Sequence, residues 1–292
     1  MKMDPKVKRA LQQLCATTGL SLSVDESDMP DDLVLQIQQL ERAYKENYSE
    51  EYYLFNLLKN EGNEWKGNKK IPLSRANISG YVMVLQCEPK QEDVILDLLR
   101  VIYPERKKSF FIKMEKGLIA FVRFQEKSEK DQLLTEFQCL REQIQSELLC
   151  DCLIGIGKYF EDKENCHDSY HQACYAICVG RRFSKKEQVY SFEKLGLYRL
   201  VDDLSKEIVQ DFMDELLWKD SIPDLDEELK QIAVSFFEHD LNVSETARHL
   251  YMHRNTLLHK LDRIESESGL DVRTFHGAVN LLLLMLMNQK ER

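Results

Sequence analysis

The segment from residue 242 to residue 263 carries side chains whose types suit contacts with DNA. Asn can pair with adenine through two hydrogen bonds, Thr can reach a base or a thymine methyl group, and Arg or Lys can bind guanine or phosphate. A recognition helix enters the major groove with its N-terminal residues leading, so Arg254, Asn255 and Thr256 are the candidates for base contacts. The full set of candidate DNA-binding residues is Ser244, Thr246, Arg248, His253, Arg254, Asn255, Thr256, His259, Lys260 and Arg263.

Two short helices are predicted to position these side chains. Asn242 or Ser244 can cap the first helix, and Glu245 completes a capping-box pattern with Asn242. The second helix is predicted to begin at His253. A rotation of 100° per residue then defines two faces. The predicted inward set is Ala247, Leu250, Leu257, Leu258, Leu261 and Ile264, with Arg254 near its edge, and the outward set is Asn255, Thr256, His259 and Arg263, with Lys260 on the flank.

Charge gives this segment modest support as a DNA-binding surface. Residues 244–263 hold four Lys or Arg against two acids, whereas the whole chain of 292 residues has a net charge of −10. DNA affinity must therefore come from a locally basic surface. Tyr251 stands where a helix-turn-helix usually has Gly, so the pattern alone leaves DNA binding and an ordinary helical bundle equally open.

Composition predicts a cytoplasmic protein of at least two domains. Hydrophobic residues make up 43% and charged residues 31% of the chain, which excludes disordered and fibrous classes. The N-terminus has no apolar segment of the kind that a secretory signal needs. The most apolar run, Val279–Met287, is far shorter than the roughly 20 residues of a membrane span. The eight cysteines are expected to be reduced thiols.

Upstream of this segment, alternating patterns predict an α+β domain. The expected order is strand 80–87, helix 91–102, strands 109–114 and 118–124, helix 129–149 and strand 152–156. A turn at 115–117 joins the two middle strands. These six elements form the split β-α-β-β-α-β arrangement, an antiparallel sheet with helices on one face. Helix 167–179, strand 188–192, helix 197–218 and a linker at 219–224 follow.

Residues 26–60 are predicted to be helical, with Pro30 and Asp31 near the start. Leu33, Ile37 and Leu40 begin one apolar stripe that Tyr44 continues. Two interpretations stay open: a helix packed on its own domain, or a short dimerising coiled coil.

Residue identities, and not only their spacing, follow a known pattern in the C-terminal segment. The matching positions are Asn242–Arg248, Leu250, His253–Leu257, Lys260, Leu261, Arg263–Glu265, Gly269–Asp271 and Arg273. They resemble the DNA-binding domain of the PucR/CdaR family of bacterial transcriptional regulators. The resemblance implies a Fis-like helix-turn-helix, an all-α domain whose recognition helix opens with residues 253–257.

The middle of the chain resembles the same family. The matching positions are Ile71–Arg75, Gly155–Gly157, Ser169, Tyr170, Ala173, Ala176, Gly180–Arg182 and Leu195–Leu200. They resemble the family's GGDEF-like domain, a degenerate relative of nucleotide cyclases. A cyclase carries an acidic pair on its central hairpin to hold metal, but the turn here has Glu115 beside Lys116. We therefore expect no cyclase activity, no other enzymatic activity and no cofactor.

These observations predict four segments. They are an N-terminal helical segment (1–65) that can include a dimerising helix, a GGDEF-like domain (66–200), a helical connector and linker (201–225) and a helix-turn-helix domain (226–292). The expected function is a sequence-specific regulator of catabolic or metabolic genes. It would bind double-stranded DNA as a homodimer, respond to an unidentified small-molecule effector or partner, and not bind membranes. The alternative is a metabolite-sensing or adaptor protein that acts by protein contact without DNA.

Three weaker patterns could each mark a further site or reflect simple packing. His167, His171, Cys174 and Cys178 share a helix face and can ligate zinc, but one straight helix cannot surround a metal with four ligands. Cys150 and Cys152 favour packing over redox chemistry. The pair Arg181-Arg182 can bind an anion, although a solvated pair near a helix C-terminus is more common.

Overall fold

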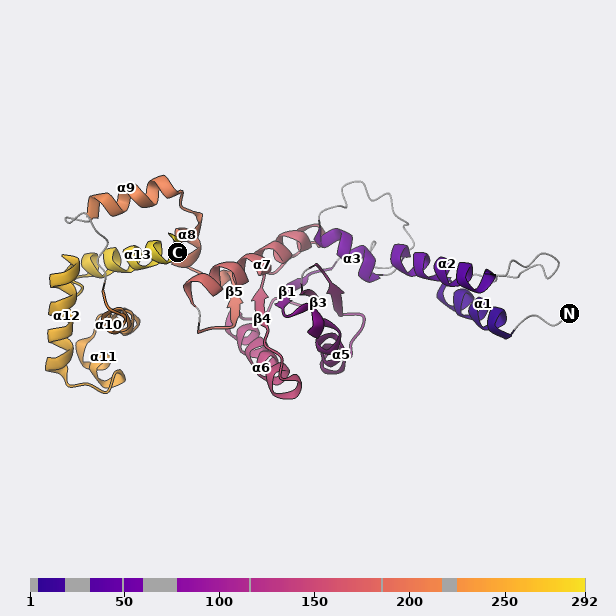
Figure 1. Cartoon of the computed structure of the whole chain (residues 1–292), viewed down its shortest axis with the longest axis horizontal. Helices are drawn as coiled ribbons and strands as arrows, with labels where there is room; N and C mark the ends of the chain where they lie inside the picture. Colours follow the sequence, from indigo (N-terminus) through magenta and orange to yellow (C-terminus); the bar gives the residue numbers. More distant parts are fainter. Residues whose placement is uncertain are drawn as a thin grey trace. The chain divides into compact units, whose positions relative to one another are not determined.

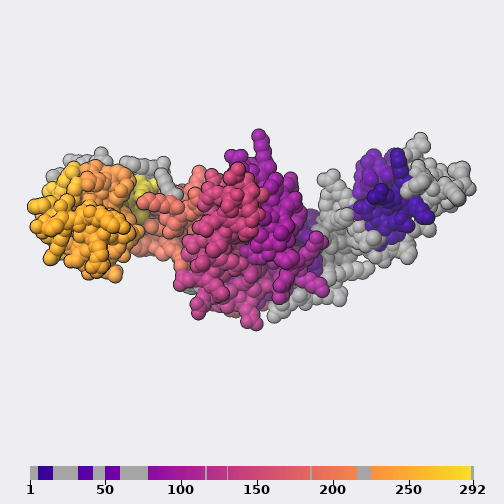
Figure 2. Space-filling model, turned by 90° about the horizontal axis from the view of Figure 1, so that it is seen from below, coloured from indigo at the N-terminus to yellow at the C-terminus, as the bar shows by residue number. Residues whose placement is uncertain are grey.

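The computed structural model describes residues 5–18, 32–48, 50–59, 78–115, 117–184, 186–216 and 225–291. By its internal contacts the chain divides into two compact units, Met1–Ile177 with Gln188–Lys194 and Cys178–Glu187 with Leu195–Arg292. Figures 1 and 2 show the described residues coloured along the sequence. Several sequence predictions fall outside the described residues: the helix start at Pro30 and Asp31, the segment Ile71–Arg75, Lys116 in the hairpin turn and the linker 219–224.

A five-stranded sheet of order β2-β3-β1-β4-β5 forms the centre of the first unit. The strands are β1 (Gly80–Gln86), β2 (Ser109–Lys113), β3 (Leu118–Phe124), β4 (Leu153–Ile156) and β5 (Val189–Ser191). β1 pairs antiparallel with β3 and β4, and β2 pairs antiparallel with β3. The predicted α+β fold and its first six elements are confirmed. β5 runs parallel to β4, so the complete sheet is mixed and not purely antiparallel.

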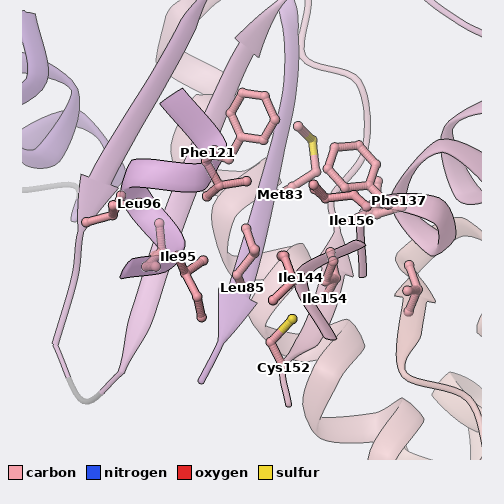
Figure 3. Close-up of a cluster of buried hydrophobic side chains, with 14 of the residues drawn as sticks. Met83, Leu85, Ile95, Leu96, Phe121, Phe137, Ile144, Cys152, Ile154 and Ile156 are labelled. Carbon is pink, nitrogen blue, oxygen red and sulfur yellow. The ribbon is translucent and has the colours of Figure 1, made fainter. Parts of the chain in front are cut away.

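One face of this sheet is covered by α5 (Glu92–Ile102) and α6 (Lys130–Leu148), as predicted. Met83 and Leu85 of β1 point to this face, where they join Phe121 of β3 and Ile154 of β4 in one apolar cluster (Figure 3). The helices contribute Ile95, Leu96, Leu99, Leu133, Phe137, Leu140 and Ile144 to the cluster.

The opposite face is covered by α7 (Cys166–Phe183), which corrects the prediction of helices on one face only. β1 is buried along six of its seven residues, as expected of a strand covered on both sides. Gly155 in β4 lets α7 approach closely, because a Cβ added at this position would lie 2.0 Å from the Ala173 carbonyl oxygen. Gly157 has the same relation to the Ser169 carbonyl oxygen, also at 2.0 Å.

Ser169 of α7 completes the hydrogen bonding of β1 beyond the end of β4. The Val82 N–H donates to Ser169 Oγ at 3.1 Å, and this hydroxyl donates to the Lys158 carbonyl at 2.6 Å. Ser169 is 2% exposed, so water cannot replace it.

We expect Ser169→Ala to destabilise the protein by about 1–3 kcal/mol, because the substitution leaves a buried N–H and a carbonyl without this partner. Chemical denaturation of the full chain measures the change. Ser146→Ala, at an exposed position of α6, is the control and should stay within about 0.5 kcal/mol of wild type. Equal stability of the two variants would contradict the bridging role of Ser169.

The N-terminal helices are α1 (Pro5–Thr18), α2 (Leu33–Tyr48) and α3 (Glu50–Leu58). α1 was not predicted from the sequence. Its apolar residues Val7, Leu11 and Leu14 pack against Ile37 of α2, with Leu33 beside them. The stripe predicted on residues 33–44 therefore has a partner within the same chain at its first two positions, while Leu40 is 61% exposed.

The second unit contains the end of α7 and six further helices. These are α8 (Leu197–Asp203), α9 (Lys206–Leu216), α10 (Glu227–Glu238), α11 (Val243–His249), α12 (Arg254–Ser268) and α13 (Phe275–Glu291). The single helix predicted over 197–218 is wrong: Leu204 adopts an extended backbone, and Ser205 Oγ accepts from the Ile208 N–H to start a new helix. Among the described helices, none combines the length and apolarity that a bilayer span requires.

Candidate DNA-binding site

α11 and α12 form a pair of short helices joined by residues 250–253 (Figure 1). Asn242 caps α11, because its side-chain oxygen accepts from the Ser244 N–H at 3.0 Å and the Glu245 N–H at 3.2 Å. The predicted capping box is not formed: the Asn242 N–H donates to the His239 carbonyl, and the Glu245 carboxylate pairs with Arg248 at 3.1 Å.

His253 caps α12 and does not lie within it, so the helix begins one residue later than predicted. Its Nδ1 accepts from the Asn255 N–H at 3.2 Å. A ring whose Nδ1 accepts carries its proton on Nε2. His253 is exposed, so this N–H is a hydrogen-bond donor at the entrance of the helix. The capping role of His253 was not predicted, because His is not among the common N-cap residues.

The buried sides of the two helices meet in the core of the second unit. Ala247 is 5% exposed, and Leu257, Leu261 and Ile264 are fully buried. They pack with residues of α10 and with Leu281 of α13. The small side chain of Ala247 at this position agrees with the prediction that α11 and α12 lie close together. Leu258, predicted to face inward, is only half-buried.

Most of the predicted contact residues are exposed. Asn255, Thr256, His259 and Arg263 lie on the open side of α12, as their period predicts, and Ser244 and Arg248 are exposed on α11. Arg254 is also exposed, which corrects its predicted place near the buried edge. Thr246 is a second correction: it is fully buried, and its hydroxyl donates to the Asn242 carbonyl at 2.8 Å. Its side chain cannot contact DNA in this conformation.

Acidic residues from outside the segment balance much of its positive charge. Lys260 Nζ lies 2.7 Å from Glu228 of α10, and Arg263 pairs with Asp226 at 3.1 Å and with Glu267 at 2.7 Å. The Glu267 carboxylate raises the pKa of Arg263, so the guanidinium stays charged. Exposed ion pairs of this kind contribute little to stability, so a DNA phosphate can replace the carboxylates.

Arg254 differs from these basic residues. In the described part of the chain, no carboxylate pairs with its guanidinium. Arg254 therefore offers an uncompensated positive charge beside the cap of α12, the end of the helix that the macrodipole also makes positive.

The weaker candidate sites of the sequence do not assemble into a second centre. The rings of His167 and His171 lie in tilted contact, with centroids 4.2 Å apart. Within the described residues, no group of three or more His, Cys, Asp or Glu side chains can hold a metal ion. Arg182 pairs with Asp202 of α8 within the same unit.

The predicted C-x-C pair belongs to the core of the first unit. Cys150 and Cys152 are buried beside Ile154, and burial raises the pKa of the Cys152 thiol to about 12. A protonated thiol is a poor nucleophile, so the environment fits packing better than redox chemistry.

Comparison with known families supports the two predicted domains. The model of the PucR C-terminal helix-turn-helix domain matches residues 229–287, and the model of the GGDEF-like domain matches residues 75–179. The first match contains α11, α12 and all of the predicted DNA-contact residues.

Three curated bacterial proteins are similar to the chain. The uncharacterized protein YxkF of Bacillus subtilis is 24% identical over 197 residues, which cover 66% of this chain and 63% of YxkF. The carbohydrate diacid regulator of Escherichia coli is 27% identical over 139 residues, 48% of this chain and 36% of the regulator. The proline-responsive transcriptional activator PutR of B. subtilis is 25% identical over 142 residues, 47% and 34% of the two chains.

These alignments span about one third to two thirds of the relatives' own lengths. A crystal structure of a regulator of polyketide synthase expression from Bifidobacterium adolescentis aligns with 90% of this chain and 100% of its own, at 11% identity and a TM-score of 0.37. The two domain matches and the regulators among the relatives confirm the resemblance to the PucR/CdaR family.

Proposed function

On the basis of its similarity to PucR/CdaR regulators, we propose that the chain is a sequence-specific DNA-binding transcriptional regulator of metabolic genes. The observation that carries the proposal is the exposed row Arg254, Asn255, Thr256 and His259 at the leading end of α12, held by a buried core on its other side. The N-terminal residues of a helix in this position can reach base edges in the major groove.

We further propose a partner and a mode of regulation. A single short helix reads few bases, so we propose a homodimer that binds two half-sites. A small-molecule effector would act on the residues upstream of the helix-turn-helix domain. It would change the separation between the two helix-turn-helix domains of the dimer. The proposal keeps the predicted segments 1–65, 66–200, 201–225 and 226–292 and a cytoplasmic location. Nine of the ten predicted contact residues remain in it, without Thr246.

We also propose that the GGDEF-like domain has no cyclase activity and needs no cofactor. Glu115, the single acid of the described hairpin, forms an ion pair of 2.8 Å with Lys59 of the segment after α3. The described part of the hairpin therefore offers no pair of carboxylates that could hold a metal ion on a nucleoside triphosphate. Incubation of the protein with GTP and Mg²⁺ should yield no cyclic product.

Selection of bound duplexes from a random-sequence library tests DNA binding directly. We expect enrichment of one sequence, with two inverted half-sites about 10 base pairs or a multiple of that spacing apart. An enriched single half-site would keep the DNA-binding function and contradict the dimer. Binding without any enrichment, or no binding at all, would contradict the proposed function and favour the alternative of regulation by protein contact.

A further inference from the structure

Tyr251 occupies a backbone position that glycine normally fills. Its φ is +51°, in the left-handed region. The Tyr251 N–H donates to the Arg248 carbonyl at 3.2 Å, and the Met252 N–H donates to the Ala247 carbonyl at 2.9 Å. These two bonds form a Schellman motif that ends α11, with Tyr251 at the position where Gly avoids the steric cost of a side chain.

The side chain of Tyr251 does not stabilise the fold in return for this strain. It is 98% exposed, so its ring packs against no described residue, and its hydroxyl forms no hydrogen bond within the described part of the chain. Backbone strain in residues other than Gly is concentrated at functional sites, where another benefit offsets it. Leu149 shows that an exposed side chain at positive φ needs no contact by itself, but Tyr251 lies directly before the helix that carries the candidate DNA-binding residues, where its ring is available to another molecule.

The neighbours of Tyr251 indicate the chemistry of that molecule. The turn lies between Arg248, whose side chain is 75% exposed at the end of α11, and the exposed pair His253 and Arg254 at the start of α12. In a helix-turn-helix complex the first helix crosses the DNA backbone and the second enters the groove. A residue between the two helices thus lies where the phosphates border the groove.

We propose that the Tyr251 hydroxyl donates a hydrogen bond to a DNA phosphate at the edge of the major groove. The proposal rests on the DNA-binding function above and adds a residue that was not among the ten predicted. Tyr is one of the side chains that hydrogen-bond phosphate oxygens, and such contacts fix the register of the recognition helix without reading sequence.

Two variants separate the contact from the strain. Tyr251→Phe removes only the hydroxyl and keeps the ring and the backbone conformation. Tyr251→Gly removes the side chain and relieves the strain. Leu149→Gly is the matched control, because Leu149 has a φ of +53°, is 87% exposed and ends α6 in the first unit.

Affinity is measured on the full chain with the sequence enriched from the library and with a random duplex, at several salt concentrations. For Tyr251→Phe we expect about 5- to 10-fold weaker binding to both duplexes. The dependence of affinity on salt should not change, because a neutral hydroxyl displaces no counterion.

Tyr251→Gly should shift stability and binding in opposite directions. Its Tm is expected to rise by about 2–4 °C, while its affinity falls at least as far as that of Tyr251→Phe. Leu149→Gly should raise Tm similarly and bind DNA as wild type does.

Each remaining outcome has a distinct meaning. If wild type selects a sequence but Tyr251→Phe binds it with unchanged affinity, the hydroxyl contact is wrong and the DNA-binding function stands, whatever the affinity of Tyr251→Gly. A fall in Tm for Tyr251→Gly would refute the strain argument. If wild type binds no duplex, the contact and the proposed function fail together.

Discussion

Replacement of Asn255 by alanine is expected to reduce discrimination between the target sequence and random DNA by about 10- to 100-fold. Asn255 is the second residue of α12 and is exposed. Its backbone N–H is bound by the His253 ring, whereas its side-chain amide has no hydrogen-bond partner among the described residues. The amide can therefore form the two hydrogen bonds that recognise adenine.

The affinity of Asn255→Ala for the target should fall strongly, and its affinity for random DNA should change little. Arg248→Ala is the matched control, because Arg248 lies on the helix that crosses the backbone and is 75% exposed. It should weaken target and random binding by the same factor and lower the slope of log affinity against log salt by about 1. Equal loss on both duplexes for Asn255→Ala would mean that Asn255 contacts only phosphate.

The parts of the structure that were predicted correctly depend on local patterns. Alternation and turn residues defined β1, β2 and β3, and the period of apolar residues defined the buried side of α12. Asn242 is a common N-cap residue, and it does cap α11. These features follow from residues that are close together in the sequence, so one sequence contains the information.

Several of the errors concern contacts between distant residues. Glu228 lies 32 residues before its partner Lys260, so the charge count over residues 244–263 could not include it. Thr246 was assigned to DNA by its type, but the close packing of α11 buries it. The period of α1 was present in Val7, Leu11 and Leu14, yet its partner Ile37 lies on another helix. α7 covers the second face of the sheet through tertiary packing at Gly155.

The ion pairs of Lys260 and Arg263 with nearby carboxylates affect how much of the DNA affinity depends on sequence. On the proposed DNA-binding surface, Lys260 and Arg263 would exchange carboxylates for phosphates, whereas Arg254 has no described carboxylate partner to exchange. Because replacing one ion pair by another gains little, these two residues add less to non-specific affinity than free cations would. Base contacts from Asn255 and Thr256 would then account for a larger share of the affinity for the target.

Gly155→Ala is expected to destabilise the first unit by about 3 kcal/mol or more, at the upper end of overpacking effects. The added Cβ would lie 2.0 Å from the Ala173 carbonyl oxygen and 2.9 Å from the Ile177 side chain. Ordinary contact distances exceed 3.4 Å, so β4 and α7 must separate. The clash is with backbone, which cannot rotate away as a side chain does.

Separation of α7 from β4 would also weaken the bridge from Ser169 to Val82, because Ser169 lies on the same helix. Thermal unfolding followed by circular dichroism should show a lower Tm for Gly155→Ala. Gly269→Ala is the comparison, since its φ is +75° but a Cβ there meets nothing within 4 Å. That variant incurs only backbone strain of about 1–2 kcal/mol. A smaller loss for Gly155→Ala than for Gly269→Ala would show that α7 does not approach the sheet this closely, and that the second face is covered less tightly than the first.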